Sequence, residues 1–273
     1  MTTIPPRPAE PPNAKAHEQR DIAESFGVDA ARYDRARSRY PDELIRRIVD
    51  TAPGREILDV GCGTGIEARQ LIAAGRTVLG VEPDERMAAF ARDSGVTVEN
   101  GKFEEWDPDG RRFDAVVAGT AWHWVDPMAG IAQAARVLRP GGPLVVFWNA
   151  GDPPSEVTAA LAAGMKQVLP DSPLPYSARR VADVYEAGCA KVAGEIAEAG
   201  GFAPARQWRF TWDDTYTRAA WLEQLSTTGG FTQAPPGALD AVLEAVGDAI
   251  DALGGSMTVR FTTLAVAAVR DDT

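Results

Sequence analysis

The residues Ile57-Leu58-Asp59-Val60-Gly61-Cys62-Gly63-Thr64-Gly65 form a short apolar run that ends in a cluster of glycines and leads into a helical pattern through Ala73. Glycines at the end of a strand let the backbone turn tightly, and the following helix offers unpaired N–H groups to a ligand. A second apolar run over 77–82 ends in Glu82, at about the 20-residue spacing at which an acid binds ribose hydroxyls. The pair predicts a site for an adenosine-containing ligand; the alternative is a glycine-rich turn followed by a solvated acid.

The glycine spacing and the charge beside it separate the possible adenosine ligands. A dinucleotide fingerprint carries its last glycine three residues after the second, where this chain has Ile66. Asp59 lies two residues before the first glycine, and its negative charge disfavours a pyrophosphate but suits an amino group or a sulfonium. The loop therefore predicts a cationic adenosine-type ligand and disfavours a nicotinamide-dependent oxidoreductase.

Strands and helices alternate along most of the chain. Continuous apolar runs predict strands over 56–60, 77–82, 96–99, 113–118 and 144–148, with two more over 206–216 and 257–270. This pattern predicts an α/β fold: a Rossmann-like, seven-stranded, mostly parallel sheet with helices on both faces and an antiparallel last strand. The predicted parts are a disordered tail (1–14), a helical N-terminal cap (15–50), a Rossmann-like ligand-binding core (51–149), a helical insertion (150–205) and C-terminal strands and helices that complete the sheet (206–273).

The composition excludes several classes of protein. The 273 residues include 28 Lys and Arg against 39 Asp and Glu, a net charge of −11, so the surface repels phosphate backbones and no nucleic-acid partner is expected. Cys62 and Cys189 cannot make a disulfide framework, and His17 and His123 are too few for a multi-histidine site, so no metal is expected. No apolar run approaches the ~18 residues of a membrane span, and the first residues carry no apolar signal core, so we expect a cytoplasmic protein without a membrane partner.

Several motifs together resemble the class I S-adenosylmethionine-dependent methyltransferases. The loop at 57–65 resembles the family's first motif, and Gly80-Val81-Glu82-Pro83-Asp84 resembles the end of its second strand. Further matches are Arg112-Phe113-Asp114-Ala115-Val116, Ala135-Arg136-Val137-Leu138-Arg139-Pro140-Gly141-Gly142 and the small-molecule branch's cap at Tyr33-Asp34-Arg35-Ala36-Arg37-Ser38-Arg39-Tyr40-Pro41. The match runs in order over about residues 26–149 and implies S-adenosyl-L-methionine as the cofactor.

The resemblance also implies roles for individual residues around that cofactor. Gly61 and Gly63 face its methionine part, Asp59 holds its amino group, and Glu82 binds its ribose. Lys102 stands where the family often has an acid or a small polar residue, so Glu104 is the candidate for the adenine amino group. The other cofactor-binding residues that the resemblance implies are Tyr33 and Arg37, which close over the cofactor with Arg37 on its carboxylate, and Pro83, Met87, Phe103 and Gly119.

The acceptor of the methyl group is expected beyond the fourth strand, at Gly119-Thr120-Ala121-Trp122-His123-Trp124, because ligands of open parallel sheets lie at the strands' carboxyl ends. His123 is the candidate catalytic residue, as a base or as a group that orients the acceptor; the alternative is a histidine that only fixes the loop. The His-Trp pair is similar to trans-aconitate-type methyltransferases. Candidate acceptor-binding aromatics are Trp122, Trp124, Tyr176 and Trp212, with residues 150–205 as the roof. Alternatively, Tyr176 and Trp212 only attach the insertion to the sheet.

The predicted function is transfer of a methyl group from S-adenosylmethionine to a small organic acceptor by in-line displacement. Two alternatives stay open. One is a methyltransferase directed at RNA or protein, which would need a basic face that this sequence does not show. The other is a protein of the same fold that binds the cofactor without transferring methyl, as a cyclase or a regulatory module. The oligomeric state cannot be read from the sequence.

Overall fold

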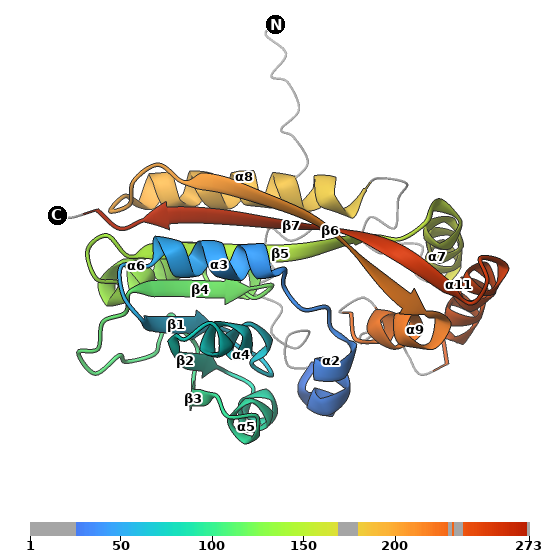
Figure 1. Ribbon diagram of the computed structural model, residues 1–273, viewed down its shortest axis with the longest axis horizontal. Coiled ribbons are helices and arrows are strands. Elements are labelled where there is room, and N and C mark those ends of the chain that lie inside the picture. The colour runs from blue at the N-terminus through green and yellow to red at the C-terminus, as the bar shows by residue number, and fades with distance from the viewer. Residues whose placement is uncertain (1–25, 169–179, 229–230, 232–236, 272–273) are drawn as a thin grey trace, which may run out of the picture.

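The computed structural model describes residues 26–168, 180–228, 231 and 237–271, and it contains one seven-stranded sheet (Figure 1). The strand order is β3-β2-β1-β4-β5-β7-β6; β1 to β5 are parallel, and β7 is antiparallel to both of its neighbours. The predicted mostly parallel Rossmann-like sheet is confirmed. The strands are β1 (Glu56–Val60), β2 (Thr77–Glu82), β3 (Thr97–Asn100), β4 (Ala115–Gly119), β5 (Pro143–Asp152), β6 (Arg206–Thr217) and β7 (Ser256–Val269).

Helices cover both faces of the sheet, which explains why β1, β4 and β5 are continuous apolar runs. On one face, α3 (Asp42–Thr51), α4 (Ile66–Ala73) and α5 (Glu85–Asp93) bury apolar side chains against β1, β2 and β5. On the other face lie α6 (Pro127–Val137) and α8 (Val181–Ala199). The α6 helix begins where its sequence predicts, because Asp126 caps it through a hydrogen bond from Ala129 N–H and Pro127 occupies its first position.

Strand β5 is longer than its apolar run suggests. It continues four residues beyond the predicted end at Trp148, because its partner β7 pairs with it from Pro143↔Val269 to Asp152↔Arg260. The carboxyl ends of β5 and β6 and the amino end of β7 therefore project past the carboxyl ends of β1 to β4. Around them pack α7 (Ser155–Val168), α9 (Arg218–Ser226) and α11 (Asp240–Ala252), which have their own apolar core (right side of Figure 1). We call these three helices the end cluster.

Two helical segments bring residues distant in sequence to the same edge of the sheet. The N-terminal cap is described from η2 (Phe26–Asp29) through α2 (Ala30–Ala36), and it lies between α5 and α9. The α8 helix packs on β5 and β7 beside α6, so this part of the segment 150–205 covers a sheet face. The predicted division of the chain into parts stays a prediction, and its tail at 1–14 lies outside the described residues.

Candidate active site

The loop after β1 presents backbone rather than side chains at the carboxyl edge of the sheet. Gly61 and Gly63 adopt φ of +64° and +54°, a left-handed conformation that favours glycine. A side chain at Gly61 would bring its Cβ within 2.7 Å of the Ala121 Cβ, so the loop after β4 also requires glycine here. The N–H of Gly61 donates to the Val81 carbonyl at 2.8 Å, which fixes the loop against β2.

Glu82, at the end of β2, is buried and bound to the same loop. One of its oxygens accepts a hydrogen bond from Gly63 N–H and the other from Asp84 N–H, both at 2.9 Å. Each carboxylate oxygen can accept a second hydrogen bond, so Glu82 keeps acceptor capacity for two ligand hydroxyls. This geometry suits the ribose role that the resemblance implies.

Two further carboxylates are buried beside Glu82. Both oxygens of Asp59 are buried without a partner in the described part of the chain, and Glu67 of α4 accepts from Gly119 N–H at 3.1 Å. Burial, together with the charges of Glu67 and Glu82, raises the pKa of Asp59 well above its usual range; burial also raises the pKa of Glu67 to about 8 and that of Glu82 to about 7. A carboxyl kept from water stays protonated to a higher pH and ionises readily only beside a positive charge, so a cationic ligand fits the site.

Glu67 was missed by the sequence analysis because a glutamate near the start of a helix is ordinary in sequence. The cation whose charge acts on Glu67, Arg69, is already bound to the Thr64 carbonyl at 2.6 Å and to Asp34 at 2.5 Å. Arg69 therefore compensates little of the negative charge that these carboxyls carry when they ionise. Between residues 26 and 271, masked stretches aside, no group of three His, Cys, Asp or Glu side chains is arranged to hold a metal ion.

The N-terminal cap lies over this edge and is fixed on two sides. Toward the sheet, Asp34 pairs with Arg69, and Gly27 packs so closely on Asp84 that a Cβ there would lie 1.9 Å from a carboxylate oxygen. Toward the end cluster, Arg35 pairs with Glu223 of α9, and Arg37 donates to the Thr227 carbonyl at 2.7 Å. The cap thus bridges the glycine loop and the end cluster.

Tyr33 and Arg37 lie against each other at the end of the N-terminal cap. The Arg37 guanidinium carbon lies 4.7 Å from the centre of the Tyr33 ring and 5.8 Å from that of Phe26. The described partner of Arg37 is a backbone carbonyl, and its Nε is buried without a partner in the described residues. That Nε remains as a donor for an anionic ligand group.

His123 lies in η3 (Trp122–Trp124), the short turn after β4, and contacts Trp148 of β5. Its Nδ1 accepts a hydrogen bond from the indole N–H of Trp148 at 3.3 Å, and its ring lies 4.6 Å from that of Trp124. Burial lowers the pKa of His123 to about 4, and the positive charge of Arg37 acts in the same direction. The imidazole is therefore neutral at pH 7.

Tyr185 of α8 completes this group, although nothing in its Ala- and Gly-rich surroundings indicated a site. Its ring lies 6.4 Å from that of Trp148. Burial raises the pKa of Tyr185, while the charge of Arg37 acts to lower it. These side chains come from four elements, η3, β5, α8 and the end of α2: Trp148 contacts His123 and Tyr185, and the charge of Arg37 acts on both of those residues.

The remaining predicted cofactor residues lie at or near the loops after β2 and β3. The Pro83 carbonyl accepts from the Asn100 side chain at 3.1 Å, and Met87 is buried with its methyl group next to Gly63. Phe103 is buried and packs 6.3 Å from Trp122, and Glu104 is half-buried beside it. Their contacts with adenine stay predictions.

The predicted acceptor-binding aromatics do not gather in one place. Trp124 lies in the site, between His123 and Phe26. Trp122 is only 2% exposed and packs in the core against Phe103, so its ring is not brought into the site. Trp212 stacks on Phe261 with ring centres 4.4 Å apart and donates a hydrogen bond to the Thr263 hydroxyl. It therefore packs against the apolar core of the end cluster. Tyr176 lies outside the described residues.

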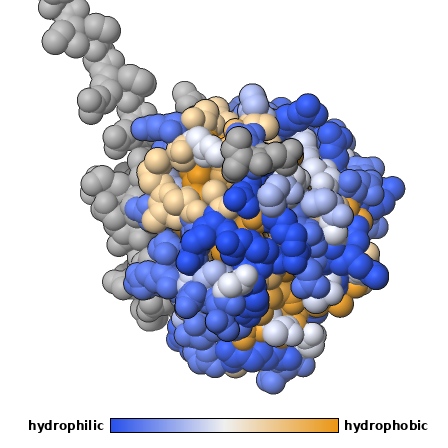
Figure 2. All heavy atoms as spheres, turned by 90° about the vertical axis from the view of Figure 1, so that its left-hand side faces the viewer, coloured by the Kyte–Doolittle hydropathy of each residue, from blue (hydrophilic) through white to orange (hydrophobic). Residues whose placement is uncertain are grey.

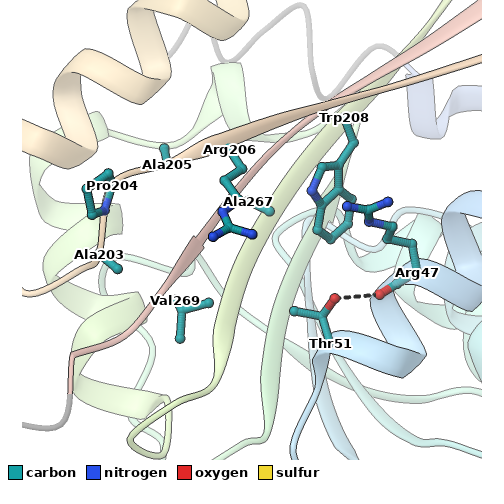
Figure 3. Close-up of a pocket in the computed structure, with 9 residues that line it drawn as sticks. All are labelled: Arg47, Thr51, Ala203, Pro204, Ala205, Arg206, Trp208, Ala267 and Val269. Atoms are coloured by element: carbon teal, nitrogen blue, oxygen red, sulfur yellow. Dashed lines mark hydrogen bonds between the residues drawn. The ribbon is translucent and has the colours of Figure 1, made fainter.

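A separate cavity of about 460 Å³ lies at the opposite end of the sheet, where β7 ends and the parallel strands begin (Figure 3). Arg47 lies over the Trp208 ring at 4.9 Å, and Arg206 and Val269 form another part of the wall. Figure 2 shows that this end of the molecule is mostly hydrophilic, with hydrophobic residues between the hydrophilic ones. Because it lies at the amino ends of the parallel strands, this cavity is distinct from the candidate active site.

The glycine loop, the acid after β2 and the strand order define the class I S-adenosylmethionine-dependent methyltransferase fold, and comparisons with known proteins agree. Residues 57–142 match the family described as "Methyltransferase domain". A Mycobacterium bovis protein named as an uncharacterized methyltransferase is 40% identical over 136 residues, which cover 49% of this chain and 56% of that protein. A demethylmenaquinone methyltransferase of Tropheryma whipplei is 33% identical over 138 residues, covering 46% of this chain and 58% of that protein.

A solved structure from Anaeromyxobacter dehalogenans, described as that of a candidate type II methyltransferase, superposes with a TM-score of 0.64 at 23% identity, over 85% of this chain and 97% of that one. This likeness shows the fold. Residues 57–142 therefore match a methyltransferase domain, and the chain that contains them has the class I S-adenosylmethionine-dependent methyltransferase fold. The matches span a little over half the length of the curated relatives, so the reaction and the acceptor are inferred from the site.

Proposed function

We propose that this protein transfers a methyl group from S-adenosylmethionine to a small organic acceptor. The observation that carries the proposal is the buried, uncompensated set of carboxylates Asp59, Glu67 and Glu82 beside a glycine loop at the carboxyl edge of the sheet. A cation with hydroxyls fits that set, because Asp59 would hold an ammonium and Glu82 would accept from ribose. When bound, the cofactor supplies a methyl group activated by its sulfonium leaving group.

The chain's own part in such a reaction is mainly positioning. Methyl transfer needs the acceptor atom about 3–3.5 Å from the methyl carbon and in line with the bond that breaks. The walls available for this are His123, Trp148 and Tyr185 on one side and the N-terminal cap with Arg37 on the other. The cap and α9, held together by Arg35–Glu223, would exclude water from the space between.

The same enclosure favours a small acceptor over a macromolecule. The cap bridges the sheet and the end cluster through Asp34–Arg69 and Arg37–Thr227, so a folded protein or a duplex would have to displace it. The net charge of −11 also opposes a phosphate backbone. A cytoplasmic location fits this proposal. In the described part of the chain, no helix combines the length and apolar character needed to cross a membrane.

Labelled-methyl transfer tests the proposal. The full chain is incubated with S-adenosylmethionine that carries a labelled methyl group and with a cell extract separated into small molecules, RNA and protein. Label in the small-molecule fraction supports the proposal, and mass spectrometry then identifies the acceptor. Label in RNA or protein would overturn the small acceptor.

Binding to the cofactor site is measured in parallel with methyl transfer, by calorimetry with S-adenosylhomocysteine. Asp59→Asn should weaken binding, whereas Asp93→Asn, at an exposed position at the end of α5, should not. Tight binding without label in any fraction would favour a protein that binds the cofactor without transferring methyl. No binding would overturn the proposed function altogether.

A further inference from the structure

The contact between Trp148 and His123 determines which imidazole nitrogen carries the proton. An indole N–H can only donate, so the Nδ1 of His123, 3.3 Å away, must be the acceptor. In a neutral imidazole one nitrogen is protonated and the other is not. With Nδ1 occupied as an acceptor, the proton of neutral His123 is on Nε2.

The surroundings of His123 keep the ring neutral. The groups that face it are Trp124 of its own turn, Trp148 of β5 and the Arg37 guanidinium at the end of α2. In the described part of the chain, no carboxylate is bonded to His123, and the one charge that acts on it is positive. Burial and that charge together lower the pKa of His123 to about 4. An imidazolium would have no stabilising partner here.

A base at this position would have to work against the same contact. To accept a proton at Nε2, neutral His123 would need its own proton on Nδ1, where it would point at the N–H of Trp148. Two donors would then face each other across a partly buried contact, which costs the hydrogen bond between them. The arrangement suits a donor at Nε2 and opposes a base there.

We infer that Trp148 is a positioning residue that holds His123 as a neutral Nε2–H donor, and that His123 orients the acceptor by donating a hydrogen bond to it. This inference rests on the proposed function and narrows its substrate class. The acceptor attacks through an atom that has no proton to lose at neutral pH, an oxyanion or an unprotonated nitrogen. Its lone pair forms the new bond to carbon, the electron pair of the broken carbon–sulfur bond stays on sulfur, and no proton is moved.

Nitrogen NMR of the two histidines tests the tautomer without any need for activity. The chain contains only His17 and His123, so His17→Gln leaves a single labelled imidazole. We expect Nε2 protonated, Nδ1 unprotonated, and no titration of the ring between pH 5.5 and 8. Trp148→Phe should give a mixture of tautomers, whereas Trp208→Phe, on the far face of the sheet, should leave the signal unchanged. A native ring with its proton on Nδ1, or one that titrates near its ordinary pKa of about 6.5, would overturn the inference.

Two substitutions of His123 separate donor from base once an acceptor is known. His123→Gln keeps an N–H donor and His123→Leu removes it, so a donor role predicts a few-fold loss of kcat/KM for the first and about a 10²-fold loss for the second. Equal losses in both, together with a rise of kcat/KM through the imidazole pKa in the native enzyme, would identify a base. If no fraction is methylated at all, the proposed function fails, while the NMR result still decides whether Trp148 sets the tautomer.

Discussion

The carboxylate of Glu82 accepts a hydrogen bond from the backbone N–H of Gly63 at 2.9 Å, which joins the end of β2 to the loop after β1. The same side chain accepts from Asp84 N–H, so it links the loop after β1 to the loop after β2. A group in this position affects ligand binding twice, through its own remaining lone pairs and through the shape of both loops.

Glu82→Gln should weaken binding of S-adenosylhomocysteine by roughly 10- to 150-fold. The amide loses a charge-assisted hydrogen bond, worth about 1.5–3 kcal/mol, and it turns an NH₂ group toward one of the two backbone donors. Titration calorimetry measures the change in Kd. Glu85→Gln, an exposed acid three residues later, is the matched control and should bind like the native chain. An unchanged Kd for Glu82→Gln would remove Glu82 from the site.

The cofactor-free protein should become less stable as the pH rises from about 5 to 8. Burial raises the pKa of Glu67 to about 8 and that of Glu82 to about 7, against 4.5 for an ordinary glutamate. Between pH 4.5 and 8 the folded chain therefore binds more protons than the unfolded chain, and the free energy of unfolding falls as pH increases. This stabilisation is fully present below about pH 4.5 and is lost as the pH passes the raised values.

Thermal unfolding from pH 5.5 to 8.5 measures this slope, and Glu67→Gln should flatten it. A cationic ligand favours the ionised carboxylates, so binding should release protons and tighten as the pH rises. Calorimetry in two buffers with different ionisation enthalpies counts the protons released. A Tm that stays level or rises over this range would contradict the assignment of raised pKa values to the buried carboxylates.

Asp34→Asn should loosen the N-terminal cap. Burial alone would raise the pKa of Asp34, but hydrogen bonds from Arg69 and Arg39 outweigh it and lower the pKa, so the ionised form is the bound form. Loss of the charge-assisted bond to Arg69 should reduce the free energy of unfolding by about 1.5–3 kcal/mol. It should also weaken cofactor binding, because the cap covers the loop that Arg69 contacts.

Chemical denaturation and the Kd for S-adenosylhomocysteine measure both effects. Glu186→Gln breaks the exposed pair with Arg209, which is worth about 0–1 kcal/mol, and provides the control. If Asp34→Asn loses no more stability than this control, the ion pair does not hold the cap in place.

The parts of the fold that could be predicted from sequence are those set by local pattern. The buried strands at 56–60 and 77–82 with the glycine loop between them were recognisable, because parallel strands covered on both faces are continuous apolar runs. The full length of β5 was not, because pairing with β7, more than a hundred residues away, extends it to Asp152. Long-range pairing leaves no local signal.

The residues of the candidate active site also divide into those that the sequence indicates and those that only the packing of the fold brings there. Asp59, Glu82 and His123 stand next to recognisable motifs, whereas Glu67 and Tyr185 lie on helices whose sequences give no sign of a ligand. They reach the site only because α4 and α8 pack against opposite faces of one sheet edge. Trp122 shows the reverse error: its place beside His123 indicated a binding role, but η3 turns its ring into the core.

Gly119→Ala should distort the site, since β4 ends where three side chains converge. A Cβ at Gly119 would lie 2.4 Å from a Glu67 oxygen, 2.7 Å from the Tyr40 hydroxyl and 2.8 Å from the Phe147 ring. Relief of this overlap must displace Glu67 from Gly119 N–H or shift β4, at a cost of about 1–3 kcal/mol in the free energy of unfolding. Gly188→Ala in α8 is the control, because its Cβ would meet nothing within 4 Å and alanine favours the helix by up to about 1 kcal/mol. In denaturant unfolding, the free energy of unfolding should therefore fall for Gly119→Ala and rise for Gly188→Ala. A Gly119→Ala protein as stable as the native chain would show that Glu67 and Tyr40 can move away from the added methyl group at no cost.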